Sequence, residues 1–472
     1  MPQRRSHVAP SAAQSELANA LAALRENLDA PTGFSPEALA EAEAAKPAEP
    51  ALDLREVPFA TLDPAGAKDL DQAFHLEKSA SGYIVRYAIA DVPGFVTPGG
   101  AVDLAARERG QTLYAADGSI PLHPRVLSED RASLLADQDR PALVWTFTLD
   151  SDGVVTATRL ERAMVRSRAQ LDYVAAQRAL DAGDDSPAAL LPEIGRLRIA
   201  QEAARGGASL NMPDEEVVRA DDGTYSIVRA RPLAIEEWNA QLSLMTGMAA
   251  ADIMLEAGVG ILRTMPEPDE KAFATFRRQT EALGRPWTRG GYGEFLRTLD
   301  LDDPLTLPVL EAAASLFRGA GYLAFDGERP KDAEQAAIAA PYTHATAPLR
   351  RLVDRWSLAI CLAVSSGQEA PEWARESLSE LPALMQASGQ RASQLNADTI
   401  NRVEAALLSP LVGSRIEATV VEVRGEDRAE IQIADPAVTA TAPLPPGAAP
   451  GDTVSLSLVR ADIAKGEVEF AL

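Results

Sequence analysis

From residue 411 onward the sequence breaks into about five short β-rich runs separated by turn residues, starting with SRIEATVVEV and ending with GEVEFAL. Five strands in so short a stretch suit a small OB-type β-barrel, a common platform for single-stranded nucleic acid. Other small barrels share this pattern, so it indicates the architecture more firmly than the ligand. We expect an OB-type barrel over residues 411–472.

The preceding part, residues 51–410, mixes strand and helix patterns. The runs YIVRYAIADV (83–92) and PALVWTFTLD (141–150) are typical of strands, and DSDG after the second predicts a hairpin turn. Apolar residues at helical spacing then predict helices over 166–183, 193–207, 235–258 and 347–364. Strands followed by helices predict an α+β domain.

Residues 1–50 form a separate helical N-terminal segment in this interpretation. Leucines at 17, 21, 24 and 28 have helical spacing, and Ser35 is placed to cap a second helix with Pro36 at its first position. The proline-flanked stretch that follows is either a linker or a segment lying over the main domain. A length of 472 residues fits two or three domains.

Composition narrows the class of protein. A hydrophobic content of 46% with 24% charged residues is ordinary for a globular chain. No apolar run is long enough to cross a bilayer, and no apolar segment follows the N-terminal arginines, so we expect a cytoplasmic protein without membrane contact. The net charge of −24 lowers the expectation of nucleic-acid binding, although a binding channel needs only local positive potential.

The stretch TLDPAGAKDLDQAF (61–74) crowds Asp63, Asp69 and Asp71 into nine positions, with Gln72 directly after them. Pro64 and Gly66 favour a turn that folds Asp63 back toward the other two. Converging carboxylates repel one another unless a cation lies between them, and oxygen ligands suit Mg²⁺ or Mn²⁺. Taken alone, the pattern fits a solvated acidic turn equally well.

A second cluster lies in YTHATAPLRRLVDRW (342–356). Its apolar residues recur at helical spacing, with Pro348 in the first turn and Thr346 as a cap. Arg350 and Arg351 would then gather with free backbone N–H groups at one helix N-terminus, which is a typical phosphate site. An exposed helix carrying an Arg–Asp pair is the alternative.

Single residues give weaker indications of function than these two clusters. Tyr114 and Tyr173 are candidates for stacking on bases, although core packing is the default for aromatic residues. His344 fits a core or capping position better than a general base. Cys361, the one cysteine, lies in an apolar run and is expected in the core.

These stretches carry a family resemblance. From about residue 58 to its C-terminus the chain resembles the RNB-type catalytic domain of the ribonuclease II / ribonuclease R family. Four stretches occur in the same order as in that family: TLDPAGAKDLDQAF, AIADVPGFVTPGGAVDLAARERGQTLYAADGSIPLHPRVLSEDRASL, RSRAQLDYVAAQ and YTHATAPLRRLVDR. The resemblance implies a 3′-5′ exoribonuclease that hydrolyses single-stranded RNA to nucleoside 5′-monophosphates with a divalent metal.

The resemblance also implies residue roles. Asp63 and Asp69 would help to hold Mg²⁺, with Gln72 offering an amide oxygen, and Asp71 would be the carboxylate most directly tied to catalysis. Arg350 would contact the scissile phosphate.

Further roles concern the RNA strand and the assembly state. Tyr114 would stack near the 3′-terminal base, Tyr173 would lie where the family distinguishes ribose, and Arg351 is a candidate RNA contact. The ending resembles the RNA-binding barrel of the family, and a monomer is expected.

The sequence departs from the family at several places. Gln72 replaces a fourth acidic residue, which should weaken metal affinity or shift the metal requirement, and Ala347 replaces a serine. Two cold-shock barrels normally precede the domain, whereas about 50 helical residues do so here, which is the pattern of a short form. The glutamate that the family places near the RNA 3′ end has no clear counterpart.

Two rival functions therefore stay open. The first is an RNB-like RNA-binding or scaffold protein with weak or no hydrolysis because of Gln72. The second is a DNA or sugar-nonspecific nuclease, which would differ in its response to the 2′-hydroxyl.

Overall fold

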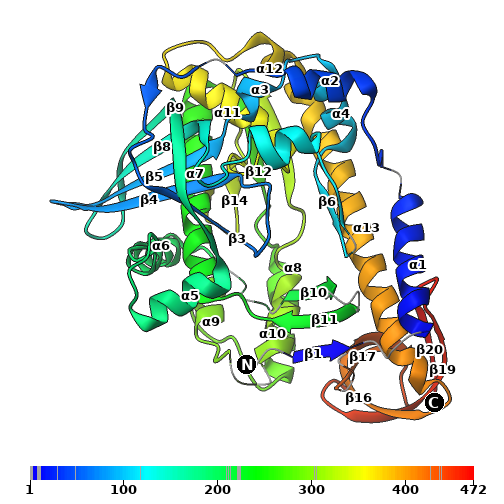
Figure 1. Ribbon diagram of the computed structural model, residues 1–472. Helices are drawn as coiled ribbons and strands as arrows, with labels where there is room; N and C mark the ends of the chain where they lie inside the picture. The colour runs from blue at the N-terminus through cyan, green and yellow to red at the C-terminus, as the bar shows by residue number, and fades with distance from the viewer. Residues whose placement is uncertain are drawn as a thin grey trace.

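The computed structural model describes residues 4–7, 12–28, 30–47, 49–116, 118–208, 210, 212, 214–219, 225–301, 303, 306–425, 427–434, 436 and 438–472. Within this part of the chain, no helix is both long and apolar enough to cross a membrane. The molecule is a large α+β body with a smaller all-β unit at the foot of a long helix (Figure 1), as the sequence predicts.

The main body is organised around a six-stranded sheet in the order β2-β9-β3-β4-β5-β8, and β8 also pairs with β9, so the sheet curls back on itself. Its strands are β2 (Leu52–Asp53), β3 (Phe59–Asp63), β4 (Gln72–Ser79), β5 (Gly82–Ala90), β8 (Asp139–Asp150) and β9 (Val155–Asp172). The alternating apolar residues of β5 and β8 face the core, where Trp145 and Phe147 stack at 6.0 Å between ring centroids. Both predicted strands and the hairpin turn between β8 and β9 are confirmed.

The body also contains helices, some of which pack on this sheet. They are α3 (Val92–Phe95), α4 (Ala101–Arg109), α5 (Tyr173–Ala182), α6 (Leu191–Arg205), α7 (Ala234–Ala257), α8 (Glu270–Ala282), α9 (Tyr292–Arg297), α10 (Thr306–Ala314), α11 (Leu352–Ser365), α12 (Glu372–Ser377) and α13 (Leu381–Leu408). Helices α8, α9 and α10 share a separate hydrophobic cluster. Short helical turns lie at Leu127–Arg131, Leu378–Glu380 and Ser409–Leu411. Buried residues of α7 and α11, Cys361 among them, share one hydrophobic cluster with the inner face of the sheet, which confirms the core position predicted for the cysteine.

A three-stranded sheet and three strand pairs complete the described part of the body. Their strands are β1 (Arg4–His7), β6 (Leu113–Ala115), β7 (Gly118–Ile120), β10 (Asp214–Arg219), β11 (Tyr225–Ala230), β12 (Val259–Thr264), β13 (Gly321–Asp326), β14 (Glu334–Gln335) and β15 (Ala340–Pro341). The sheet has the order β1-β11-β10, and the pairs are β6-β7, β12-β13 and β14-β15. Strands β6 and β7 form a hairpin that carries Tyr114.

One predicted helix is partly wrong. Residues 166–172 were expected to be helical, but they continue β9, and the helix α5 begins only at Tyr173. This part of β9 pairs in parallel with β3, and its long-range ladder outweighs the local helical spacing. Asp172 then caps α5 by accepting a hydrogen bond from the Ala175 backbone at 2.8 Å.

The N-terminal helices α1 (Ala12–Glu26) and α2 (Pro36–Ala44) confirm the predicted pattern. Ser35 caps α2 by accepting from the Ala38 N–H at 3.2 Å. Glu41 of α2 in turn accepts a hydrogen bond from the Ala101 N–H at the start of α4, at 2.6 Å. The segment that follows α2 lies over the main domain, because β2 pairs with β9.

Helix α1 runs beside α13 (Figure 1) and contacts two different parts of the molecule. Near one end Leu17 and Leu21 are buried in the same cluster as the C-terminal barrel. Toward its other end, Leu24, together with Leu28 just beyond the helix, packs against the β6–β7 hairpin.

The C-terminal unit is a five-stranded antiparallel sheet in the order β18-β17-β16-β19-β20, which confirms the expected number of strands. Its strands are β16 (Arg415–Arg424), β17 (Arg428–Ile433), β18 (Val438–Pro443), β19 (Thr453–Asp462) and β20 (Glu467–Ala471). Strands β18 and β20, at the two ends of this order, also approach each other, so the sheet forms a nearly closed OB-like barrel.

Candidate active site

The acidic stretch links the end of β3 to the start of β4. Asp63 is the last residue of β3, and the chain then turns with the Ala67 N–H donating to the Pro64 carbonyl at 3.1 Å. Gly66 has a φ of 81°, a conformation that glycine adopts without strain. The turn predicted from Pro64 and Gly66 is therefore confirmed.

Asp71 is the most buried of the three carboxylates, with 3% of its surface exposed. Its Oδ1 accepts a hydrogen bond from the Leu349 N–H at 2.7 Å, across 278 residues of sequence. Its Oδ2 lies 3.4 Å from Nε of Arg350 and accepts no hydrogen bond within the described residues. Burial raises the pKa of Asp71 well above its usual value, and the charge of Arg350 opposes this shift.

Arg350 lies in a turn, and the sequence-based prediction of its surroundings is wrong in one respect. We expected a helix starting near Pro348 with Thr346 as its cap, but α11 begins at Leu352, with Arg351 at the cap position and no side-chain cap. Tertiary contacts hold the preceding residues in the turn. The Ala347 N–H donates to Oδ1 of Asp354 at 2.6 Å, for example.

The arginines of this motif have different environments. Arg350 keeps 42% of its side-chain surface exposed and faces Asp71. Arg351 is paired with Asp354 at 2.9 Å, and Arg355 with Asp103 at 2.6 Å. The predicted helix N-terminal phosphate site therefore does not form as expected, and the contact of Arg351 with RNA stays a prediction.

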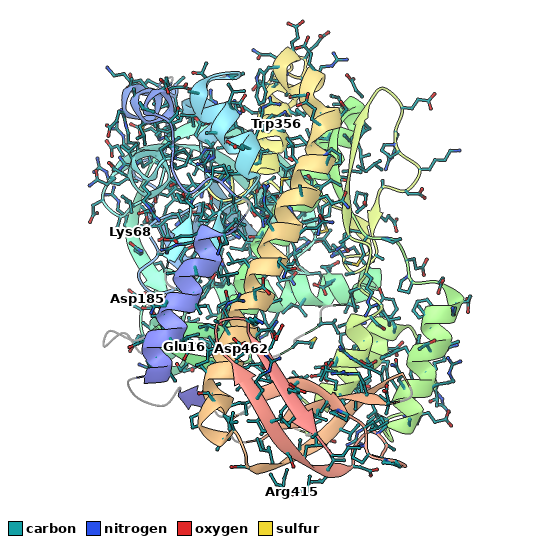
Figure 2. All side chains as sticks on the ribbon, turned by 90° about the vertical axis from the view of Figure 1, so that its right-hand side faces the viewer. Glu16, Lys68, Asp185, Trp356, Arg415 and Asp462 are labelled. Atoms are coloured by element: carbon teal, nitrogen blue, oxygen red, sulfur yellow. The ribbon has the colours of Figure 1, made fainter. Side chains whose placement is uncertain are left out.

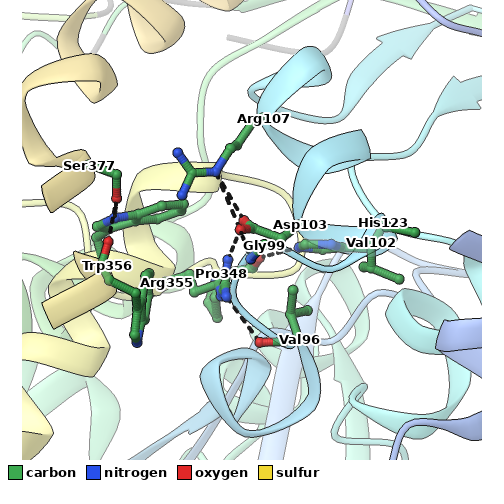
Figure 3. Close-up of polar contacts among 12 residues, drawn as sticks. Val96, Gly99, Val102, Asp103, Arg107, His123, Pro348, Arg355, Trp356 and Ser377 are labelled. Atoms are coloured by element: carbon green, nitrogen blue, oxygen red, sulfur yellow. Dashed lines mark hydrogen bonds and ion pairs between the residues drawn. The ribbon is translucent and has the colours of Figure 1, made fainter. Parts of the chain in front are cut away.

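A buried polar network below the turn fixes its position (Figure 3). Asp103 of α4 pairs with Arg355 and, at 3.3 Å, with Arg107, while Arg355 also donates to the Val96 carbonyl at 2.9 Å. His123, which is 1% exposed, places Nε2 3.3 Å from the Pro348 carbonyl. Burial and the nearby charge of Arg355 lower the pKa of His123 to about 4, so the imidazole is neutral.

Asp63 and Asp69 lie near the same arginine. Burial, and to a lesser extent the charge of Asp69, raises the pKa of Asp63 to about 6, whereas Arg350 lowers it. Asp63 Oδ2 is buried and accepts no hydrogen bond in the described part of the chain. Asp69 accepts a hydrogen bond from the hydroxyl of Tyr114 at 2.9 Å, and Tyr114 itself is 56% exposed.

Gln72 has both ends of its amide engaged. Its Nε2 donates to the Thr346 carbonyl at 2.6 Å, and its Oε1 accepts from the Tyr87 hydroxyl at 2.7 Å. The Tyr87 hydroxyl also lies 2.9 Å from that of Ser243 on α7. Gln72 thus ties the acidic strand to the loop of Arg350, and its role as a metal ligand stays a prediction.

Two further predicted residues lie around this centre. The Tyr173 hydroxyl accepts a hydrogen bond from Asn239 of α7 at 3.4 Å, and burial raises its pKa to about 12. His344 is buried, with Nδ1 2.7 Å from the Tyr322 hydroxyl, and burial lowers its pKa well below the usual value. The structure therefore agrees with a core position for His344.

The donor set fits a divalent cation in its chemistry. Asp63 and Asp71 each present a buried carboxylate oxygen without a hydrogen-bond donor, and a nearby cation would offset the cost of keeping such groups charged. In the described residues, however, no three His, Cys, Asp or Glu side chains form a ready metal-binding group. Asp69 is instead bonded to Tyr114, and Arg350 lies against Asp71.

Comparison with known families explains this combination of acids and arginine. A model of the RNB domain matches residues 51–360. The chain belongs to the RNB family. Residues 414–472 of this RNB-family chain match the RNase II-type exonuclease C-terminal S1 domain. The family resemblance inferred from the four ordered motifs is thus confirmed.

Curated relatives are named exonucleases or exoribonucleases. Exosome complex exonuclease RRP44 homolog A of Arabidopsis thaliana is 28% identical over 320 residues, which cover 64% of this chain and 34% of the relative. Exoribonuclease 2 of Vibrio vulnificus is 37% identical over 124 residues, covering 26% of this chain and 19% of the relative. The chain thus spans about a third or less of the length of these relatives.

Solved structures share the fold of this RNB protein. Apo Mycoplasma genitalium RNase R aligns with a TM-score of 0.85 at 16% identity, over 97% of this chain and 78% of that one. Yeast Ssd1, described as a pseudonuclease, aligns with a TM-score of 0.68 at 17% identity, over 91% and 55%. At these identities the likeness establishes the fold alone.

Sequence reasoning missed several residues that hold the site together. Asp103 and His123 support the Arg350 turn from elements more than 200 positions away, and no local pattern marks them. Asn239 lies in α7, a largely buried helix whose sequence does not distinguish it from a packing residue. Asp354 was visible as the partner of an Arg–Asp pair, but its bond to the Ala347 backbone depends on the turn.

Proposed function

We propose that the chain is a 3′-5′ exoribonuclease that hydrolyses single-stranded RNA to nucleoside 5′-monophosphates with Mg²⁺ or Mn²⁺. One observation carries the proposal: Asp71, buried and fixed by the Leu349 N–H, turns its second oxygen toward the half-exposed guanidinium of Arg350. Carboxylates for a cation and an arginine for a phosphate thus occupy one centre, which is the combination that phosphodiester hydrolysis needs. The names of the curated relatives support the same reaction.

Each residue has a physical task in this proposal. Asp63 and Asp71 would hold the cation through the carboxylate oxygens that accept no hydrogen bond. Asp69 would join them once its hydrogen bond with the Tyr114 hydroxyl is broken. When bound, a divalent cation polarises phosphoryl oxygens and lowers the pKa of a water molecule. Arg350 keeps N–H groups for the phosphate and offsets the charge that develops on it.

The base and sugar of the terminal nucleotide would be held by aromatic side chains. Tyr114 is exposed beside Asp69, where its ring is accessible for stacking on the 3′-terminal base. Tyr173 carries a hydroxyl near Asp63 that can interact with the ribose. Mycoplasma genitalium RNase R has been solved with ribose-methylated single-stranded RNA, which is consistent with such a substrate for this fold.

A second candidate is an RNB-like protein that binds RNA with little or no hydrolysis. The specific observation in its favour is Gln72, whose amide is held by Tyr87 and Thr346, so that this position contributes no negative charge to a cation. Yeast Ssd1, with the same fold, is described as a pseudonuclease.

The test uses single-stranded RNA labelled at either end, with Mg²⁺ or Mn²⁺ titrated. The proposal expects a labelled mononucleotide as the first product from 3′-labelled RNA and progressively shorter strands from 5′-labelled RNA. Asp71→Asn should abolish release of monophosphates and keep RNA binding. Asp130→Asn, which removes a carboxylate that is 62% exposed, serves as the matched control and should keep full activity.

The same assay separates the rivals. RNA binding without product at any metal concentration would favour the non-hydrolytic candidate, and equal rates on matched RNA and DNA would contradict the preference for ribose. Full activity in Asp71→Asn would refute the assignment of the active site.

A further inference from the structure

The C-terminal barrel lacks the aromatic surface by which such barrels bind single strands. OB-type barrels stack successive bases on exposed aromatic side chains along a positively charged groove. Residues 411–472 contain one aromatic residue, Phe470, and it is 5% exposed within the core of the barrel. The barrel therefore offers no ring for a base.

Its charge is also unfavourable to a phosphate backbone. Residues 411–472 carry five basic and ten acidic residues, a formal net charge of −5. Arg460 lies within 3.1–3.6 Å of three carboxylates, those of Glu467, Glu469 and Asp462. Arg424 is paired with Glu430 and Glu422. These carboxylates offset the charge of both guanidiniums and so weaken their attraction for a phosphate.

The surface on which an OB-type barrel holds a strand is itself acidic. Oligonucleotides bind such barrels across the second and third strands, which correspond in order to β17 and β18. A hollow of about 350 Å³ lies there, between these strands, β20 and α13. Its charged lining consists of Glu404, Glu430, Glu467 and a single arginine, Arg428.

Two neighbouring helices instead pack on the barrel. Leu17 and Leu21 of α1, and Val403 and Leu407 of α13, belong to its hydrophobic cluster. Glu404 of α13 accepts a hydrogen bond from the Thr439 N–H of β18 at 3.1 Å. Figure 2 shows the barrel beneath α13 and beside α1, with Arg415 at the far end of the molecule from Trp356.

We infer that the C-terminal barrel of this chain is a structural support for α1 and α13 and does not hold RNA, so that the single strand is bound by residues 51–410 alone. The inference rests on the proposed function, because it concerns the same RNA. It differs from the expectation that the family resemblance attaches to residues 411–472, which stays untested.

The test measures binding of fluorescent single-stranded RNA to the full chain carrying Asp71→Asn, over a range of salt concentrations. Adding Arg428→Glu or Arg415→Ala should change the Kd less than two-fold and leave the slope of log Kd against log salt unchanged, because no phosphate contact is lost. Adding Tyr114→Ala, the positive control in the catalytic part, should weaken binding between about five-fold and about a hundred-fold. Melting curves identify any variant that fails to fold.

A second measurement does not depend on substitutions. RNA containing 4-thiouridine is crosslinked to the Asp71→Asn chain, and the crosslinked peptides are identified by mass spectrometry. Crosslinks confined to residues 51–410 support the inference. Crosslinks in β17 or β18, or a loss of affinity above five-fold for Arg428→Glu, overturn it while leaving the proposed function intact. Absence of RNA binding by every form would refute both.

Discussion

Replacing His123 with glutamine should remove a defined part of the acid sensitivity of the fold. His123 is 1% exposed, and its Nε2 faces the Pro348 carbonyl at 3.3 Å. Burial and the charge of Arg355 lower its pKa to about 4 in the folded chain. Glutamine can donate the same hydrogen bond to Pro348 but has no proton to gain.

The sign and size of the change in stability follow from the pKa values of His123 in the folded and the unfolded chain. In the unfolded chain the imidazole has a pKa of about 6.5, so as pH falls the unfolded state binds the proton first and stability is lost. The contribution is fully present above about pH 6.5 and is lost as pH falls toward 4. Between pH 7.5 and pH 5.0 the loss amounts to about 2 kcal/mol.

The assay is urea unfolding of the unmodified chain and of His123→Gln at both pH values. The free energy of unfolding of the unmodified chain should fall by about 2 kcal/mol more than that of the variant. Contributions from other titrating groups, His344 included, are common to both proteins and cancel. Equal losses in the two proteins would refute the argument that His123 is held neutral.

Three further predictions concern the stability of the fold and the accessibility of the Cys361 thiol. Asp103→Asn should lower the free energy of unfolding by about 3 kcal/mol or more, since buried Arg355 loses its partner; an unchanged urea midpoint would contradict this. Leu17→Ala should cost about 2–4 kcal/mol by leaving a cavity, whereas Leu104→Ala, at a 60% exposed residue, should change stability by less than about 0.5 kcal/mol. Cys361 should react with a thiol reagent only on unfolding, because burial raises the pKa of its thiol and excludes the reagent; fast labelling of the folded chain would argue against its core position.

The sequence predicted best those elements whose pattern depends on near neighbours. Strands β5 and β8, helices α6 and α7 and the Ser35 cap form where alternation, helical spacing or capping chemistry indicates them. The turn at Pro64 and Gly66 belongs to the same group.

Elements fixed by distant partners were mispredicted. Residues 166–172 have helical spacing but extend along β3. The start of α11 moves to Leu352 because Asp71, Asp354 and His123 hold the preceding residues in a turn. At the site, the pairing of Asp71 with Arg350 followed from the family motif, whereas the bonds that orient both residues come from side chains without a local signal.

The attachment of α1 at both ends has a mechanical consequence. Leu17 and Leu21 seat it in the barrel, and Leu24 and Leu28 press on the hairpin that carries Tyr114. The N-terminal segment therefore connects the barrel, through continuous apolar packing, to the hairpin whose Tyr114 hydroxyl bonds Asp69 at the acidic centre. Packing of the barrel against this segment thus contributes to the support of the hairpin that presents Tyr114.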